Sequence, residues 1–215
     1  MDRAMHFRRS VQRRRSERDL QAMAVDFPEV DGHPNRLPFE GCLTLVDIPS
    51  DKAPSGAQGH RVVLTKQAAE LALPSLLGMA VDYKAGWDGH DARQKCGIIT
   101  SAHLVGSRLL VGGFLFARDY PEMEARVSGA GTEINAVMGM SYELADAHVA
   151  DMRDTVWRLT RATFTGAAIL LREKAAYRAT SFRVSRRGDH RQTRAAVTKR
   201  DVPMDDRKTE EGNGR

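Results

Sequence analysis

Two residues about fifty positions apart are the candidates for chemistry in this chain. Ser141 lies in Gly139-Met140-Ser141-Tyr142, within a segment that alternates apolar and polar residues as strands do. His90 lies in Trp87-Asp88-Gly89-His90-Asp91, a loop between two expected strands, where a side chain can be presented to a cleft. A serine becomes a nucleophile when a base takes its proton, and imidazole titrates in the right range. The pair is therefore a candidate for acyl transfer, although many such pairs are structural and only geometry decides.

The other histidines fit the role of base less well. His148 is seven residues beyond Ser141 on what reads as the same strand. An odd separation puts two strand residues on opposite faces, and seven residues span over roughly 20 Å. His103 is expected within a strand, and His60 begins one beside a flexible loop. The rest lie in expected tails or a linker: His6, His33 and His190.

No metal or cofactor site is indicated. Asp88, His90 and Asp91 could ligate a metal, but no H-x-x-x-H or C-x-x-C cluster accompanies them. Gly129 and Gly131 form G-A-G without the rest of a phosphate-binding loop. We expect the chain to work without a cofactor.

Composition favours a soluble, intracellular protein. The chain has 215 residues, a net charge of +5 and two cysteines, Cys42 and Cys96, which fits a reducing compartment better than a disulfide scaffold. No apolar run approaches the roughly 20 residues that a membrane-spanning helix needs. No apolar stretch follows the basic N-terminus, so we do not expect a secretory signal.

The sequence divides into three regions. Residues 1–38 join a basic arm to a linker rich in proline and glycine, residues 39–181 hold the expected domain, and residues 182–215 form a charged tail. The tail has too few large apolar residues to offset its ordering entropy, so we expect it to be disordered. The arm could serve nucleic acid or an acidic protein surface, or be a solvated extension. Its arginines are Arg3, Arg8, Arg9, Arg13, Arg14, Arg15 and Arg18.

Short strand patterns and frequent turn signals dominate the middle region. They predict a mainly β (α+β) fold, a compact and partly closed barrel-like domain with a few short helices. Helices are expected at 66–73, where Thr65 can cap the first turn, and at 122–127. Gly106 and Ser107 mark a hairpin turn. The expected strands are 41–48, 61–64, 76–83, 97–105, 109–116, 136–146 and 155–170.

The order of these segments resembles the prohead (capsid maturation) proteases of tailed bacteriophages, relatives of the herpesvirus assemblin serine proteases. The resemblance covers roughly residues 39–180 and depends on order and spacing together. It implies a compact β-barrel-like protease with His90 as general base and Ser141 as nucleophile. The matching segments are Gly89-His90-Asp91, Cys96-Gly97-Ile98-Ile99, Gly139-Met140-Ser141-Tyr142 and the run at 162–170.

The resemblance also implies a biological setting. Such an endopeptidase processes the scaffold and major capsid proteins, and its own tails, inside assembling proheads in the bacterial host cytoplasm. The resemblance is compatible with self-association, and it implies no membrane partner and little role for nucleic acid.

One position departs from the family. Its third catalytic member is commonly an acid, or histidine in the herpesvirus branch, and the matching position here reads as Arg161, which only donates hydrogen bonds. Three accounts stay open: a dyad, an acceptor such as Asp91, Glu143 or Thr163, or a fold that has lost activity. The alternatives to a protease are an inactive capsid-assembly protein of this fold and a nucleic-acid-binding protein. The basic arm lacks the interleaved aromatics that would favour the last.

Overall fold

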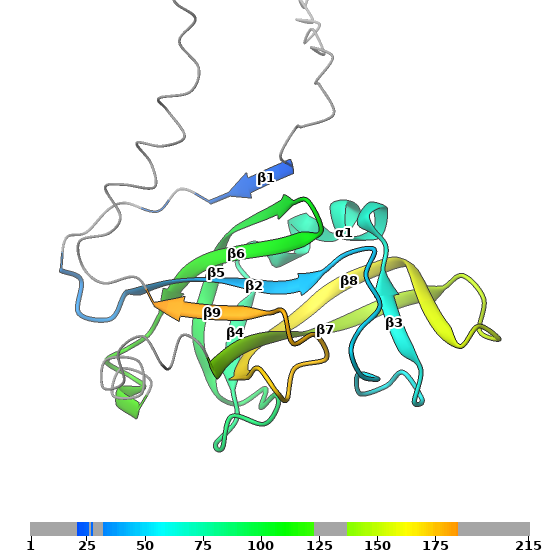
Figure 1. The fold of residues 1–215 in the computed structure, drawn as a ribbon. Coiled ribbons are helices and arrows are strands. Elements are labelled where there is room, and N and C mark those ends of the chain that lie inside the picture. The colour runs from blue at the N-terminus through cyan, green and yellow to red at the C-terminus, as the bar shows by residue number, and fades with distance from the viewer. Residues whose placement is uncertain (1–20, 26, 28–31, 123–136, 185–215) are drawn as a thin grey trace, which may run out of the picture.

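The computed structural model describes residues 21–25, 27, 32–122 and 137–184, and in these residues nine strands form one sheet (Figure 1). The strand order is β3-β8-β4-β5-β6-β2-β9, with β1 added on β5 and β7 on β8. The two ends of this path, β3 and β9, do not pair, so the sheet curls without closing. The strands are β1 Gln21–Ala24, β2 Leu37–Leu45, β3 Arg61–Leu64, β4 Ala80–Tyr83, β5 Lys95–Val105, β6 Arg108–Leu115, β7 Met138–Val149, β8 Val156–Leu171 and β9 Ser181–Val184.

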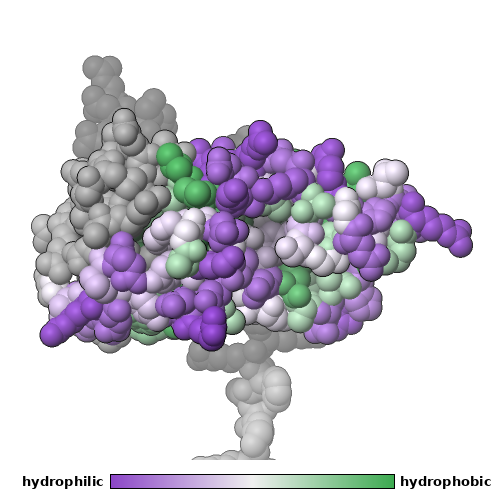
Figure 2. Space-filling view, turned by 90° about the horizontal axis from the view of Figure 1, so that it is seen from below, coloured by the Kyte–Doolittle hydropathy of each residue, from purple (hydrophilic) through white to green (hydrophobic). Residues whose placement is uncertain are grey.

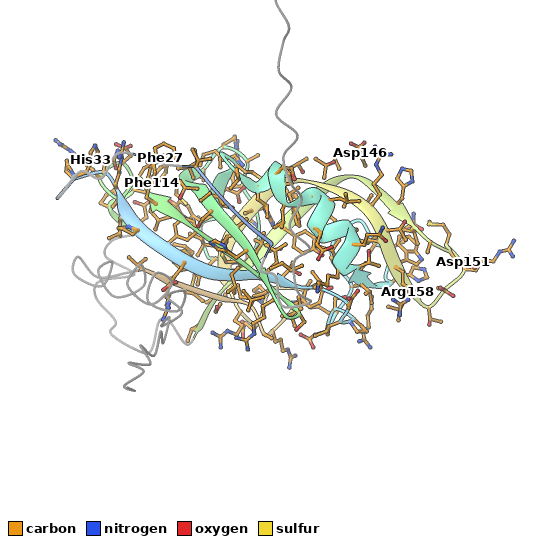
Figure 3. All side chains as sticks on the ribbon, turned by 90° about the horizontal axis from the view of Figure 1, so that it is seen from above. Phe27, His33, Phe114, Asp146, Asp151 and Arg158 are labelled. Carbon is orange, nitrogen blue, oxygen red and sulfur yellow. The ribbon has the colours of Figure 1, made fainter. Side chains whose placement is uncertain are left out.

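The long strand β8 positions three others. β3 and β4 lie parallel to it along one edge, near its beginning and its end, and β7 runs antiparallel along the opposite edge. In Figure 1 the β7–β8 hairpin crosses the lower part of the molecule. The connection between β7 and β8, which carries Asp151, lies at the end of the molecule opposite Phe27 and His33 (Figure 3).

One apolar core fills the inside of the curled sheet. Alternate residues of the strands point into it, among them Leu43, Ile99 and Met140, each fully buried. Helix α1, Lys66–Ala72, adds the buried Ala68 and Ala69 to this core. Its first turn is capped by Thr65, whose Oγ1 accepts a hydrogen bond from the Ala68 backbone N–H at 3.2 Å.

The structure confirms the expected mainly β fold class and its few short helices. It corrects the strand expected at 76–83, because Leu73–Leu76 forms a 3₁₀ helix and the strand starts only at Ala80. Pro74 at the start of that turn and Gly78 at φ +78° explain the delay. The hairpin of β5 and β6 turns at Gly106, as expected.

The sheet reaches beyond 39–181, since β1 pairs with β5 and β9 pairs with β2. Most of the helix expected at 122–127 lies outside the described residues, as do the basic arm up to residue 20 and the tail from residue 185. No described helix is long and apolar enough to cross a membrane.

Candidate functional site

His90 is held by a loop that is tied down on both sides. The loop joins β4 to β5, and its Trp87 carbonyl accepts a hydrogen bond from the Leu171 backbone N–H at 2.8 Å, at the end of β8. On the other side, the Asp91 backbone N–H donates to the Asp82 carboxylate on β4 at 3.3 Å. The Trp87 ring stacks on Tyr83 with centroids 5.0 Å apart. These contacts fix His90 over the ends of β4 and β8.

Two carboxylates approach the same nitrogen of His90. The His90 Nδ1 lies 3.5 Å from an Asp82 oxygen and 3.7 Å from a Glu143 oxygen. Both ring nitrogens are buried, and neither makes a hydrogen bond within the described part of the chain. With the acids gathered at Nδ1, Nε2 is left for another partner.

Asp82 is a charged group inside the protein. Its side chain is 0% exposed, and its second oxygen bonds the Lys95 Nζ at 2.9 Å. Burial alone would raise the pKa of Asp82, but the nearby His90 and Lys95 outweigh burial and hold that pKa below its usual value. Asp82 is therefore ionised at neutral pH. Asp82 was not among the site residues expected from the sequence, because the strand that brings it to the site pairs it with Ala168, more than eighty residues away.

Strand register places Ser141 on the same side of the sheet as Asp82. Ser141 on β7 lies opposite Ala168 on β8, and Ala168 lies beside Asp82 on β4. Directly paired residues project to the same face, so the small Ala168 side chain separates the two polar ones. Glu143 follows Ser141 by two residues, before the first irregularity of the pairing, and shares this face.

Two glycines give these groups room. A Cβ atom at Gly139 would lie 2.6 Å from the Thr180 Oγ1 and 3.2 Å from the Arg172 Cα, so only glycine lets the segment after β8 pack beside Ser141. A Cβ at Gly166, opposite Glu143, would lie 2.5 Å from a Glu143 carboxylate oxygen. The Glu143 carboxylate thus lies over Gly166.

His90, Ser141 and Glu143 line one groove of about 1090 Å³. Both faces of β7 contribute to it, because Tyr142 and Leu144 line it as well. In the described residues β7 pairs only with β8, and it also packs against β2 and β9. The loop 52–58 forms one wall of the groove. Apolar side chains from β3, β7, β8 and the turn after β7 also line it: Val62, Leu144, Val149, Met152, Trp157 and Leu159.

The structure brings His90 and Ser141 to this groove but shows no hydrogen bond between them. Such bonds are often long before substrate binds. His148 does not line the groove, and it lies seven residues along β7 from Ser141, opposite Arg161.

The expectation that Arg161 occupies the third catalytic position is wrong. Seven residues of β8 separate Arg161 from Ala168, the residue opposite Ser141, which is roughly 20 Å of strand. Of the other proposed acceptors, Asp91 binds Arg93, whose backbone and side chain lower the pKa of Asp91. Thr163 lies opposite Ala145 and is not part of the groove.

The described residues contain no group of three or more side chains that could hold a metal ion. The surface seen from below in Figure 2 is mostly hydrophilic, with small, separate hydrophobic areas. The exposed large apolar side chains of the described residues are scattered over several elements, among them Leu71, Val105 and Met152.

Comparison with known proteins gives a distant likeness. No family model and no curated protein matches the chain. One similar solved structure is the crystal structure of KSHV protease in complex with a hexapeptide phosphonate inhibitor, at 14% sequence identity and a TM-score of 0.43. The match covers 70% of this chain and 65% of that protein.

Proposed function

We propose that this chain is a serine endopeptidase with Ser141 as nucleophile and His90 as general base. The observation that supports it is the convergence of Ser141 and His90 on one groove, with two carboxylates at the Nδ1 of the same imidazole. A nucleophile, a base and an acid that orients the base are the parts that acyl transfer needs.

The reaction is a double displacement at a peptide carbonyl. The Ser141 Oγ bonds the carbonyl carbon while its proton passes to the His90 Nε2, and backbone N–H groups stabilise the oxyanion. The C–N bond then breaks, and His90 returns the proton to the departing amine. Water attacks the acyl-enzyme with the same help from His90, which releases the carboxylic acid and restores Ser141.

The groove suits an extended peptide. A segment lying along the edge of β7 away from β8 can pair with its backbone and so add a strand to the sheet. The apolar part of the groove, with Leu144, Val149 and Trp157, offers a place for a bulky apolar side chain of such a peptide.

The sequence resemblance supports a finer form of the proposal. The substrates are the scaffold and major capsid proteins of an assembling phage head, and the chain's own terminal segments. The processing takes place inside proheads in the cytoplasm of the bacterial host.

A second candidate is an inactive capsid-assembly protein of the same fold. The specific observation in its favour is the missing hydrogen bond between His90 and Ser141.

Labelling with an alkyl fluorophosphonate, followed by intact mass spectrometry, distinguishes the two. We expect one adduct on Ser141 in the unmutated chain and in His148→Ala, and none in Ser141→Ala or His90→Ala. In co-expression with capsid and scaffold proteins, the unmutated chain and His148→Ala should process these two substrates. An unlabelled wild-type chain that cleaves nothing leaves the assembly role as the better account. Loss on His148→Ala with His90→Ala active would show that His90 is the wrong base.

A further inference from the structure

We propose that Asp82 is the group that orients His90, so that the acid of this site comes from β4, before the histidine in the chain. The inference rests on the proposed function, because it assigns the acceptor for the proposed base. Asp82 would act on His90 and not on the substrate, so it is a positioning residue.

The spacing of the strands places Ser141 and Asp82 at a distance that the His90 ring can bridge. Ser141 and Asp82 are separated by the single strand β8, on the same face, so their Cα atoms are about 10 Å apart. His90 lies over this interval with its Nδ1 at 3.5 Å from the Asp82 carboxylate. An imidazole that donates from Nδ1 to Asp82 carries its lone pair on Nε2, as a base for Ser141 must.

β8 itself offers no charged acceptor near Ser141. The residues from 162 to 171 include no carboxylate and no imidazole, and their polar side chains are Thr163 and Thr165. Of these, Thr165 lines the groove, and its hydroxyl carries no charge to stabilise an imidazolium. A charged acceptor for His90 therefore comes from outside this part of β8.

Glu143 is the alternative acceptor for His90, and its interaction with the imidazole is weaker. Its carboxylate lies 3.7 Å from the His90 Nδ1, and its side chain is 48% exposed, where water screens the interaction. Asp82 is closer and fully buried. It is also held by two further contacts, from Lys95 and from the Asp91 backbone N–H. A carboxylate fixed in this way needs no reorganisation when charge develops on the imidazole.

Lys95 explains how a buried carboxylate is tolerated beneath a histidine. Its ammonium group bonds the Asp82 oxygen that does not face His90, which offsets part of the cost of burying the charge. The charged groups near His90 are Asp82 from β4, Lys95 from β5, Glu143 from β7, and two pairs in the loop, Asp88 with Lys84 and Asp91 with Arg93. Lys174 after β8 lines the same groove.

The rate of Ser141 labelling by an alkyl fluorophosphonate as a function of pH tests the assignment in the full chain. We expect Asp82→Asn to slow labelling by about 10³-fold and Glu143→Gln by less than tenfold. The acid limb of the Asp82→Asn profile should move to lower pH, because an amide stabilises the imidazolium less than a carboxylate does. A loss of packing alone would leave the position of that limb unchanged. Labelling of Asp82→Asn within tenfold of the wild type, or a larger loss in Glu143→Gln, would overturn the proposal.

NMR of the His90 ring nitrogens gives a readout that needs no activity. The neutral ring should carry its proton on Nδ1 in the wild type and in Glu143→Gln, and this preference should weaken in Asp82→Asn. If the wild type is not labelled, the proposed function fails, and this measurement still decides about Asp82. If Asp82→Asn does not fold, the spectra of the wild type and of Glu143→Gln decide. A neutral ring that carries its proton on Nε2 in the wild type rejects Asp82. A proton that leaves Nδ1 in Glu143→Gln rejects it as well.

Discussion

Asp82 and Glu143 approach the same nitrogen of His90 from very different environments. The first is fully buried and bonded to Lys95, and the second is half exposed over Gly166. An ion pair is screened at the surface and matters most where water is excluded. We therefore expect Asp82 to affect both stability and catalysis, and Glu143 to affect mainly the binding of substrates that enter the groove.

The depressed pKa of Asp82 has a consequence for stability at low pH. Because the folded-state pKa lies below the unfolded value of about 3.9, the stabilisation is fully present above that value and is lost as the pH falls through the folded pKa. Asp82→Asn should lower the free energy of unfolding by about 1–3 kcal/mol at pH 7, and the difference should shrink below about pH 4. Urea unfolding at pH 7, 5 and 3.5 measures it.

The control for this prediction is Asp88→Asn. Asp88 belongs to the same loop as His90, but its carboxylate is 48% exposed and pairs with the equally exposed Lys84. Its loss should change the free energy of unfolding by less than about 1 kcal/mol. A deficit in Asp82→Asn that stays the same at every pH would show that packing, and not charge, causes it.

Single residues were only partly predictable from the sequence. His90 and Ser141 could be nominated because a loop histidine and a strand serine have local signatures. Asp82 could not, because its role comes from pairing across β8, which links positions more than eighty residues apart. Arg161 was misplaced for the same reason, since register in a long hairpin depends on irregularities such as those at Glu143/Leu144 and Ala145/His148.

At the scale of elements, β8 determines how the site is assembled. The strands β5 and β6 and helix α1 follow from local patterns, and the structure confirms them. The parallel pairing of β3 and β4 with β8 joins distant parts of the chain, and no short sequence pattern indicates it. That pairing brings the His90 loop to the serine strand, so the part of the fold that matters most for the proposed function was the least predictable.

Gly139 tests how closely the segment after β8 packs on the serine strand. An alanine there would place its methyl group against the Arg172 backbone and the Thr180 hydroxyl, whose own oxygen donates to the Tyr177 carbonyl at 2.9 Å. Gly139→Ala should cost about 1–3 kcal/mol of unfolding free energy and slow the labelling of Ser141. Thermal unfolding and fluorophosphonate labelling measure the two effects.

Gly89→Ala is the matched control for stability. Its Cβ would meet only the Lys84 Cδ, at 3.9 Å, which is ordinary contact. It should unfold within about 0.5 kcal/mol of the wild type. Equal stability of the two alanine variants would mean that the Arg172–Thr180 segment gives way easily and does not hold the serine strand.

At the scale of the whole molecule, the net charge of +5 raises the question of the partner. Seven arginines precede β1, and the described surface in Figure 2 is mostly hydrophilic with no large apolar area. A basic segment of this kind can bind phosphates or an acidic protein surface. We propose that its main partner is protein, in the capsid or scaffold.

Deletion of residues 1–20 tests the role of the basic segment without removing any part of the site, because every described strand and α1 lie C-terminal to it. The shortened chain should keep its thermal unfolding temperature and label at Ser141 within about twofold of the wild type, while co-sedimentation with capsid and scaffold assemblies weakens. A full-length variant with the seven arginines replaced by glutamine distinguishes charge from length. If the partner were nucleic acid, binding to duplex DNA would be tight and would fall steeply with salt, because phosphate contacts release counterions. Tight binding of that kind, abolished by the deletion, would replace the protein partner with DNA.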